Sequence, residues 1–252
     1  MSLDYVVELH EVVVDYHHNR ALDHLSLKVH KGDIFGFIGP NGAGKTTTIK
    51  VILGLISAAK GTVLLQGRSP LDPKARTKVG FLPEETTYYR FLTPVEILTF
   101  CGEIFHLSKS ALKKRIQELL QLVGLSEVQH KPIRFFSKGM AKKIGLAQAL
   151  INDPDVLILD EPTSGLDPLA RMELRKILAE LKNHGKTIFF SSHELSEIEL
   201  LCDSVAIIQN GKLIQSGTLA ELLQSRQEQS LERFFLDTIQ RGGTFEKHLG
   251  IV

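Results

Sequence analysis

The sequence is poor in the residues that mark several classes of protein. It has no tryptophan, three methionines and two cysteines among its 252 residues. Cys101 and Cys202 are far apart and lack the close spacing of metal ligands. We therefore expect both thiols to be reduced and buried or half-buried, as in a cytosolic protein.

Long apolar runs are also missing. No stretch approaches the roughly 18 apolar residues that indicate a membrane-spanning helix. We therefore expect that the chain does not cross a membrane by itself, although it could lie against a protein that does. The first residues, MSLDYVVELHEVVVDY, carry acidic groups and alternate in polarity, which is unlike a signal peptide. Together these features predict a cytoplasmic chain.

An excess of one charge is missing as well. Lys and Arg together number 30, and Asp and Glu number 29. A nucleic-acid binder that works by neutralising phosphates needs a basic surface, and this balance argues against one. We therefore expect no nucleic acid among the partners.

The patterns that are present alternate between strands and helices. Residues 5–16 read as an edge strand, residues 34–39 as a short buried strand, and residues 45–56 show the spacing of a helix. Such alternation predicts an α/β fold with a mostly parallel, doubly wound sheet. The length of 252 residues allows one large domain or a domain with an inserted subdomain.

A mainly helical insertion is predicted at about residues 86–150. Apolar residues recur there at helical spacing, and Thr93 and Ser108 stand where helix caps belong. The continuous apolar run that follows, residues 155–162, suits a strand that is covered on both faces. The insertion therefore lies between two strands of the predicted sheet.

The C-terminal part begins with a predicted hairpin over residues 204–217, with Asn210-Gly211 at its turn. Residues 224–230, QSRQEQS, read as a linker to a short tail. Within the tail, LERFFLDTI has the pattern of a short amphipathic helix. We expect this helix to pack on the core, with a partner subunit as the alternative.

A glycine-rich loop carries the clearest chemical signal. It has the pattern G-x-x-x-x-G-K-T and stands between a predicted strand and a predicted helix, as a phosphate-binding loop does. Without Cβ atoms the backbone can wrap closely round an anion, and the start of the helix adds a favourable partial charge. The loop comprises Gly39, Pro40, Asn41, Gly42, Ala43, Gly44, Lys45 and Thr46.

The end of this loop supplies polar side chains for a nucleotide. Lys45 can reach the β- and γ-phosphates, and the Thr46 hydroxyl can ligate Mg²⁺. Thr47 is placed to contact the α-phosphate. The pattern therefore predicts that the glycines make room for a triphosphate.

Two carboxylates follow a later apolar strand, in the segment VLILDEP. Asp160 at the strand end would lie beside the Mg²⁺, as in other P-loop enzymes. Glu161 can accept a proton from an attacking water or orient it, and a positioned base contributes about 10²–10⁴-fold in rate. An acidic pair alone could be a solvated strand end. Combined with the glycine loop, it points to nucleotide hydrolysis.

These motifs resemble, in type and order, those of the nucleotide-binding subunit of ATP-binding cassette (ABC) transporters. The resemblance runs from about Tyr5 to Gly217. It implies a P-loop NTPase core with a mostly parallel sheet, an N-terminal antiparallel β region and an inserted helical subdomain. On this basis we expect an ABC ATPase domain over residues 1–220, with the helical subdomain at about 86–150, and a C-terminal linker and short tail over 221–252.

The resemblance assigns roles to further residues. Tyr16, in YHHNRAL, would stack on adenine, although a tyrosine at a strand end can also simply face solvent. His193 follows an apolar strand and would contact the γ-phosphate and the catalytic centre. Asp167, in SGLDP, would lie at the seam of a dimer, and it would also cap the helix that begins near Pro168.

Two positions depart from the family pattern. The signature usually written Leu-Ser-Gly-Gly-Gln is replaced by the segment FSKGM, in which only Ser137 and Gly139 match. Ser137 is a good helix cap, and Gly139 leaves its N–H open for an anion. Glu84 stands where the family carries a glutamine. We expect Glu84 still to touch the metal or its water, with more negative charge beside the triphosphate.

The implied activity is ATP hydrolysis in a composite site. Each signature helix would cap the γ-phosphate held by the glycine loop of another copy, in a dimer of two such chains or of one chain and a close relative. The cofactors would be ATP and Mg²⁺. Movement would pass to separate membrane permease subunits through a groove at the helical insertion and the Glu84 loop, on the cytoplasmic face of the membrane.

Other functions within the same family stay open. Some ABC ATPases act on DNA, ribosomes or cofactor assembly rather than on transport, and a binding module could sense ATP without hydrolysing it. The intact set of Lys45, Asp160, Glu161 and His193 argues against the sensor. Nothing in the sequence identifies a transported molecule, and only family analogy favours export.

Overall fold

The computed structural model describes residues 4–17, 19–85, 88–225 and 230–242. Its centre is a six-stranded sheet with the order β5-β6-β7-β3-β8-β9. Neighbouring strands from β5 to β8 run parallel, and β9 is antiparallel to β8. The strands are β3 (Ile34–Ile38), β5 (Val79–Leu82), β6 (Val156–Asp160), β7 (Thr187–Ser192), β8 (Ser204–Gln209) and β9 (Lys212–Thr218). This confirms the mostly parallel α/β sheet.

A second, antiparallel sheet is built from β1 (Tyr5–Tyr16), β2 (Asn19–His30) and β4 (Lys60–Leu65), in the order β2-β1-β4. The expected antiparallel β region is therefore present. The prediction that residues 5–16 form an edge strand is wrong, because β1 pairs with a strand on each side. Its second partner lies far along the chain, and local residue patterns do not reveal such a pairing.

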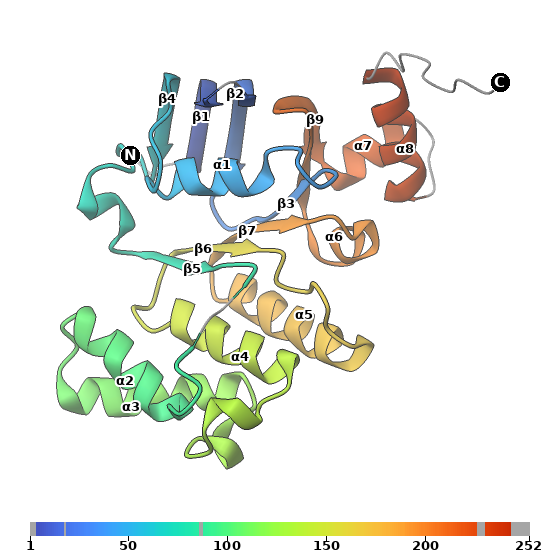
Figure 1. Ribbon diagram of the computed structural model, residues 1–252. Coiled ribbons are helices and arrows are strands. Elements are labelled where there is room, and N and C mark those ends of the chain that lie inside the picture. The colour runs from blue at the N-terminus through green and yellow to red at the C-terminus, as the bar shows by residue number, and fades with distance from the viewer. Residues whose placement is uncertain (1–3, 18, 86–87, 226–229, 243–252) are drawn as a thin grey trace.

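The central strands are buried on both faces. Every residue of β3 and β6 is buried. Along β3, Phe35 and Phe37 belong to a core shared with the antiparallel sheet, whereas Ile34 and Ile38 face the opposite core. Figure 1 shows the antiparallel sheet and α1 above the central sheet, and α4 and α5 below it. Alternation of side chains along each strand thus divides the apolar residues between two cores.

The segment between β5 and β6 contains α2 (Pro94–Ile104), α3 (Lys109–Leu122) and α4 (Lys138–Ala149). It forms the lower part of Figure 1. Thr93, Ser108 and Ser137 cap these three helices, and Thr93 forms a reciprocal capping box with Glu96. The caps predicted at Thr93, Ser108 and Ser137 are therefore confirmed.

The remaining helices are α1 (Lys45–Ile52), α5 (Pro168–Asn183), α6 (Leu195–Leu201), α7 (Leu219–Ser225) and α8 (Leu231–Gly242). Helix α1 is shorter than the predicted 45–56, because the chain turns at Gly54, which has a φ of +67°. Both cysteines are buried free thiols, as expected. Within the described residues, we find no helix with the length and apolar character that a membrane span requires.

The C-terminal helix packs on the core. Leu231 and Phe234 are buried, and α8 contacts α6. Figure 1 shows α7 and α8 beside β9 and α6. Residues 226–229 of the predicted linker lie outside the described residues, and residues 224 and 225 belong to α7. The division of the chain at residue 220 stays a proposal.

Candidate functional site

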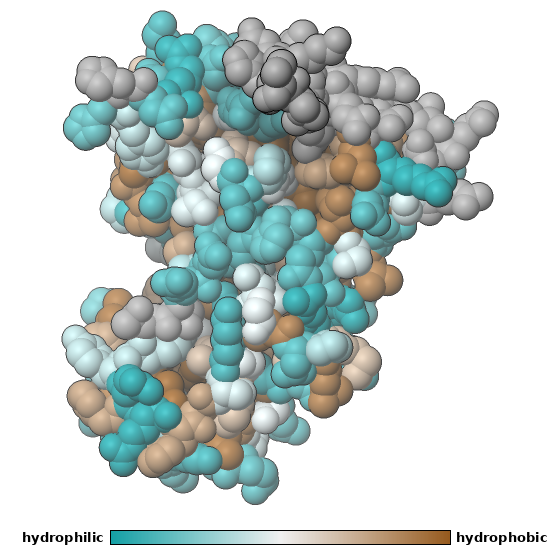
Figure 2. Space-filling model, turned by 45° about the vertical axis from the view of Figure 1, so that its right-hand side comes forward, coloured by the Kyte–Doolittle hydropathy of each residue, from teal (hydrophilic) through white to brown (hydrophobic). Residues whose placement is uncertain are grey.

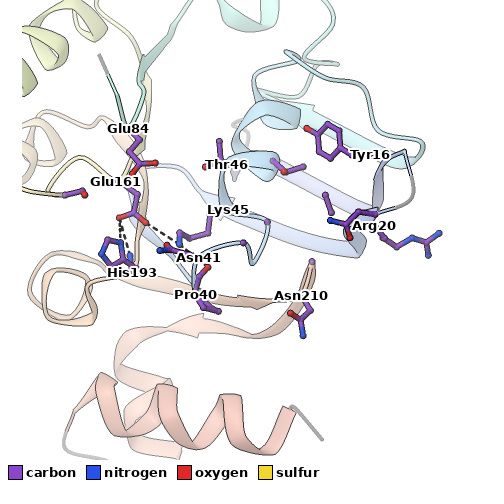
Figure 3. A pocket seen from close by; sticks show the side chains of 17 residues that line it. Tyr16, Arg20, Pro40, Asn41, Lys45, Thr46, Glu84, Glu161, His193 and Asn210 are labelled. Atoms are coloured by element: carbon purple, nitrogen blue, oxygen red, sulfur yellow. Dashed lines mark hydrogen bonds and ion pairs between the residues drawn. The ribbon is translucent and has the colours of Figure 1, made fainter. Parts of the chain in front are cut away.

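A cavity of about 690 Å³ opens where the β3–α1 loop, the first β-hairpin and the ends of the parallel strands meet. This volume lies within the range of small-molecule sites, about 300–1,000 Å³. Figure 3 places Tyr16 and Arg20 at one side of the cavity, and Glu161 and His193 at the other. The lining comprises Tyr16, Asn19, Arg20, Ala21, Pro40, Asn41, Gly42, Gly44, Lys45, Thr46, Thr47, Glu84, Glu161, Ser164, His193, Asn210 and Gly211.

The glycine loop owes its shape to two different requirements. Gly42 and Gly44 have φ values of +79° and +110°, which residues other than glycine adopt only with strain. Gly39 has an ordinary backbone, but a Cβ added there would lie 2.3 Å from the carbonyl oxygen of Ile208. Gly39 does not line the cavity. The absence of a side chain at Gly39 lets the loop pack against β8. The sequence pattern by itself explains this glycine only by the space that phosphates need.

Gly39→Ala is expected to lower the free energy of unfolding by about 1–3 kcal/mol, because the new methyl group overpacks the contact with β8. Gly217→Ala is the matched control, since its Cβ would meet Leu222 at an ordinary 3.4 Å. Urea unfolding of the two variants and the unchanged chain measures the difference. Equal stabilities of the two variants would contradict the packing role of Gly39.

Three side chains converge at the floor of the cavity. The Lys45 Nζ lies 3.3 Å from the Glu161 Oε1 and donates to the carbonyl oxygen of Gly39 at 2.7 Å. The Nδ1 of His193 lies 2.8 Å from the Glu161 Oε2. Figure 3 shows the contacts of Glu161 with Lys45 and His193 as dashed lines. Lys45 and Glu161 are both buried, so their charges interact with little screening by water.

The carboxylate of Asp160, the residue before Glu161, is held by two hydroxyl groups. The Oγ1 of Thr46 donates to the Asp160 Oδ2 at 3.1 Å, and the Ser191 Oγ donates to the Asp160 Oδ1 at 2.6 Å. Ser191 also accepts the N–H of Glu161 at 2.9 Å. Asp160 is buried at the end of β6. Ser191 was not predicted as a site residue, since its sequence position on a buried strand carries no chemical signal.

The backbone of Glu161 is unusual. Its φ is +46°, in the left-handed region of backbone conformation that residues other than glycine seldom occupy. Such conformations cost about 1–3 kcal/mol and persist where the surrounding contacts hold them. The turn directs the side chain of Glu161 toward Lys45 and His193 (Figure 3).

Beside Glu161, α4 contributes a lysine that was not predicted as a site residue. Lys142 is 3% exposed, and its ammonium donates to the carbonyl oxygens of Glu84, Pro83 (3.3 Å) and Glu161 (3.5 Å). Burial lowers the pKa of Lys142 from its usual value, and the neighbouring Lys138 lowers it further. Attraction to Glu84, Asp160 and Glu161 acts in the opposite direction.

The far side of the cavity also holds residues that were not predicted there. Arg20 is held by Asp15 and Asp23, each 3.0 Å away. Its nearness to Tyr16 in sequence is the only signal that could have placed it. Asn210, predicted as a turn residue, reaches the cavity because β8 lies beside β3.

Gly39, Ala43 and Asp160 do not line the cavity but adjoin residues that do, whereas Ser137, Gly139 and Asp167 lie apart from it. Ser137 accepts the N–H of Met140 at 3.2 Å and caps α4. Asp167 accepts the N–H of Ala170 at 2.9 Å and caps α5, as predicted. Gly139 lies against the start of α5, where an added Cβ would stand 3.3 Å from Ala170. Within one chain, these residues form a separate group at the starts of two helices.

The site has the donor set that a magnesium nucleotide requires. Mg²⁺ prefers oxygen ligands and usually takes one or two carboxylates together with phosphate oxygens and water. Thr46 and Asp160 already lie in contact, and Glu84 lines the same cavity. No group of three or more His, Cys, Asp or Glu residues that could hold a metal occurs in the described ranges. The chain thus offers a few oxygen ligands, which a bound nucleotide would complete.

Comparisons with a family model, with related sequences and with solved structures all point to the same family. Residues 22–164 match the family model described as "ABC transporter". An uncharacterized ABC transporter ATP-binding protein of Synechocystis is 48% identical over 205 residues, which cover 81% of this chain and 58% of that relative. The bacitracin transport ATP-binding protein BcrA of Bacillus licheniformis is 38% identical, with 98% of this chain and 80% of that relative covered.

A solved structure described as the ATP binding subunit of an ABC transporter matches with a TM-score of 0.84 and 31% identity, over 93% of this chain and all of that chain. The structure thus agrees with the family model and the relatives. The family model covers more than half of this chain. The chain belongs to the ATP-binding subunits of ABC transporters, a family of P-loop ATPases.

Proposed function

We propose that this chain binds and hydrolyses ATP and thereby drives transport through a separate membrane permease. The observation that carries the proposal is the convergence of Lys45, Glu161 and His193 in one cavity beside the glycine loop. The buried lysine would bind the phosphates, and the buried carboxylate beside it would activate the attacking water. The names of the relatives, which include bacitracin transport, support the same class of function.

The loop and its helix would hold the triphosphate. The N–H groups of the loop and the start of α1 favour an anion, and Lys45 adds a full positive charge. Thr47 would contact the α-phosphate, and Tyr16, which is 42% exposed at the cavity wall, offers its ring to the adenine base. Thr46 and Asp160 would hold Mg²⁺, with Glu84 touching the ion or its water. Bound there, Mg²⁺ would neutralise charge on the transferred phosphoryl group.

Glu161 is the proposed general base. Its two carboxylate oxygens face Lys45 and His193, so the side chain has a defined orientation toward the cavity. It would orient a water and take up its proton, and His193 would contact the γ-phosphate from the same side. Lys45 would stabilise charge that develops on the phosphate.

The group formed by Ser137, Gly139 and Asp167 would serve another copy of the chain. It lies outside the cavity, at the starts of α4 and α5. A helix start with a serine cap and a glycine favours an anion. In a head-to-tail dimer, Ser137 and Gly139 would reach the γ-phosphate held by the partner copy, and Asp167 would lie at the seam. Loss of the γ-phosphate on hydrolysis would weaken this closed dimer.

The permease would dock on the helical segment between β5 and β6. This segment exposes several large apolar side chains, and Figure 2 shows brown and tan atoms on the lower lobe that it forms. Single exposed apolar residues are common, but a group on one subdomain favours a protein partner. The chain would then lie at the cytoplasmic face of a membrane. The exposed set comprises Tyr89, Phe91, Phe100, Ile104, Phe105 and Phe135.

Two measurements test the proposed function. The purified chain is expected to release phosphate from ATP in the presence of Mg²⁺ and to stop when the ion is chelated. A tagged chain is expected to co-purify with an integral membrane protein from detergent-solubilised membranes. Phosphate release without a membrane partner, but with a soluble macromolecule, would instead indicate an ABC ATPase outside transport. ATP binding without phosphate release would indicate a sensor.

A further inference from the structure

Lys142 lies at the junction of three parts of the molecule. It stands on α4 and is 3% exposed, although lysines are rarely this deeply buried without partners. Its ammonium donates to the carbonyl oxygens of Pro83 and Glu84, just after β5, and of Glu161, just after β6. One side chain of the helical segment therefore contacts both strand ends that carry the proposed metal-contacting and catalytic carboxylates.

The contact with Glu161 falls on the residue whose backbone is strained. With a φ of +46°, Glu161 needs its neighbours to hold its main chain. Ser191 accepts its N–H at 2.9 Å, and Lys142 donates to its carbonyl oxygen at 3.5 Å. The carbonyl oxygen of Glu161 also accepts the N–H of Ser164 at 3.2 Å, so Lys142 is the side chain that adds to a backbone bond there.

The contact with Glu84 acts in the same way on the other strand end. The side chain of Glu84 is exposed and lines the cavity, while its carbonyl oxygen faces Lys142. The positive charge of Lys142 lies close enough to be attracted by the carboxylates of Glu84, Asp160 and Glu161. Asp160 and Glu161 are buried, so the nearby cation offsets part of the repulsion between their carboxylates with little screening by water.

We propose that Lys142 is a positioning residue of the ATPase site, which holds the main chain at Glu84 and Glu161 and so sets where their carboxylates stand. This inference rests on the proposed function. Lys142 touches no reacting atom, and it acts through Glu161. Because it belongs to α4, a movement of the helical segment would reach both carboxylates through this one side chain.

Lys142→Met tests the proposal, because methionine keeps much of the apolar stem and removes the ammonium. Lys143→Met is the matched control, since the neighbouring Lys143 pairs with Glu173 at 2.7 Å, away from the cavity. We expect Lys142→Met to lower kcat for ATP hydrolysis by about 10–100-fold, as is typical of residues that orient a ligand-bearing group. The KM of Lys142→Met for ATP should change less than about threefold. The kcat of Lys143→Met should also stay within about threefold of that of the unchanged chain.

A second readout does not depend on turnover. A glutamate-specific protease is expected to cleave the nucleotide-free chain after Glu84 several-fold faster in Lys142→Met than in Lys143→Met, because the carbonyl of Glu84 has lost its donor. An unchanged cleavage rate, or an unchanged kcat, overturns the proposal. If wild-type chain releases no phosphate, the proposed function fails, and the cleavage rate alone decides whether Lys142 holds the strand end.

Lys142→Gln covers the case in which the methionine variant does not fold. Glutamine keeps N–H donors but loses the charge and one bond of length. Thermal unfolding first checks that each variant is folded. A loss in kcat of more than about threefold with an unchanged KM supports the proposal, because a mispositioned base loses rate rather than affinity. A kcat equal to that of the unchanged chain overturns it.

Discussion

Glu161→Gln is expected to lower kcat for ATP hydrolysis by about 10²–10⁴-fold and to leave ATP binding intact. The amide has nearly the shape of the carboxylate, but it cannot take a proton from water. The change also removes the negative charge 3.3 Å from the Lys45 Nζ, so the lysine becomes more available to phosphates. ATP should therefore bind at least as tightly as in the unchanged chain.

Phosphate release at saturating ATP measures the rate, and a fluorescent ATP analogue measures the affinity. Glu180→Gln is the control, because Glu180 is exposed near the end of α5 and has no role in the cavity. With ATP and Mg²⁺, the Glu161→Gln variant should also elute as a dimer in size-exclusion chromatography. An unchanged kcat in Glu161→Gln would show that Glu161 is not the general base. A strictly monomeric variant at high concentration would remove the composite site.

Lys45→Met is expected to raise the Kd for ATP by on the order of 100-fold or more. Hydrogen bonds to charged groups contribute about 1.5–3 kcal/mol each, and two such bonds to phosphate oxygens correspond to at least 3 kcal/mol. The substitution also leaves the buried carboxylate of Glu161 without its cation, which adds repulsion toward the triphosphate. Both effects weaken binding.

The control for this change lies on the same helix. Lys50 is exposed near the end of α1, and Lys50→Met should leave the Kd within about threefold, as surface substitutions usually do. Equilibrium titration with a fluorescent ATP analogue compares the two variants. Equal affinities of Lys45→Met and Lys50→Met would show that the lysine of the loop does not bind phosphate.

Short-range patterns were reliable guides to most elements. The glycine loop predicted a strand before it and a helix after it, and the structure has β3 and α1 there. The cap residues Thr93 and Ser108 begin α2 and α3 as predicted. Such signals succeed because a cap or a tight turn depends on residues only a few positions apart.

Partners that are distant in sequence could not be predicted in this way. The edge-strand interpretation of residues 5–16 failed because β4, about 50 positions further on, pairs with the other side of β1. The sequence pattern explains the need for glycine at position 39 only in part, because the contacting residue Ile208 belongs to a strand far along the chain. Neither contact leaves a trace in the local pattern of apolar and polar residues.

The sequence by itself determined the chemical content of this protein: a loop for phosphates, oxygen ligands for a divalent cation, and a base beside them. Those properties follow from residue types and close spacing, which the backbone converts directly into local geometry. Only the tertiary structure decided that Glu161 lies between Lys45 and His193, that Gly39 packs against β8, and that Lys142 contacts two strand ends. The physical reason is that these contacts depend on the order of strands in the sheet and on how helices pack across it.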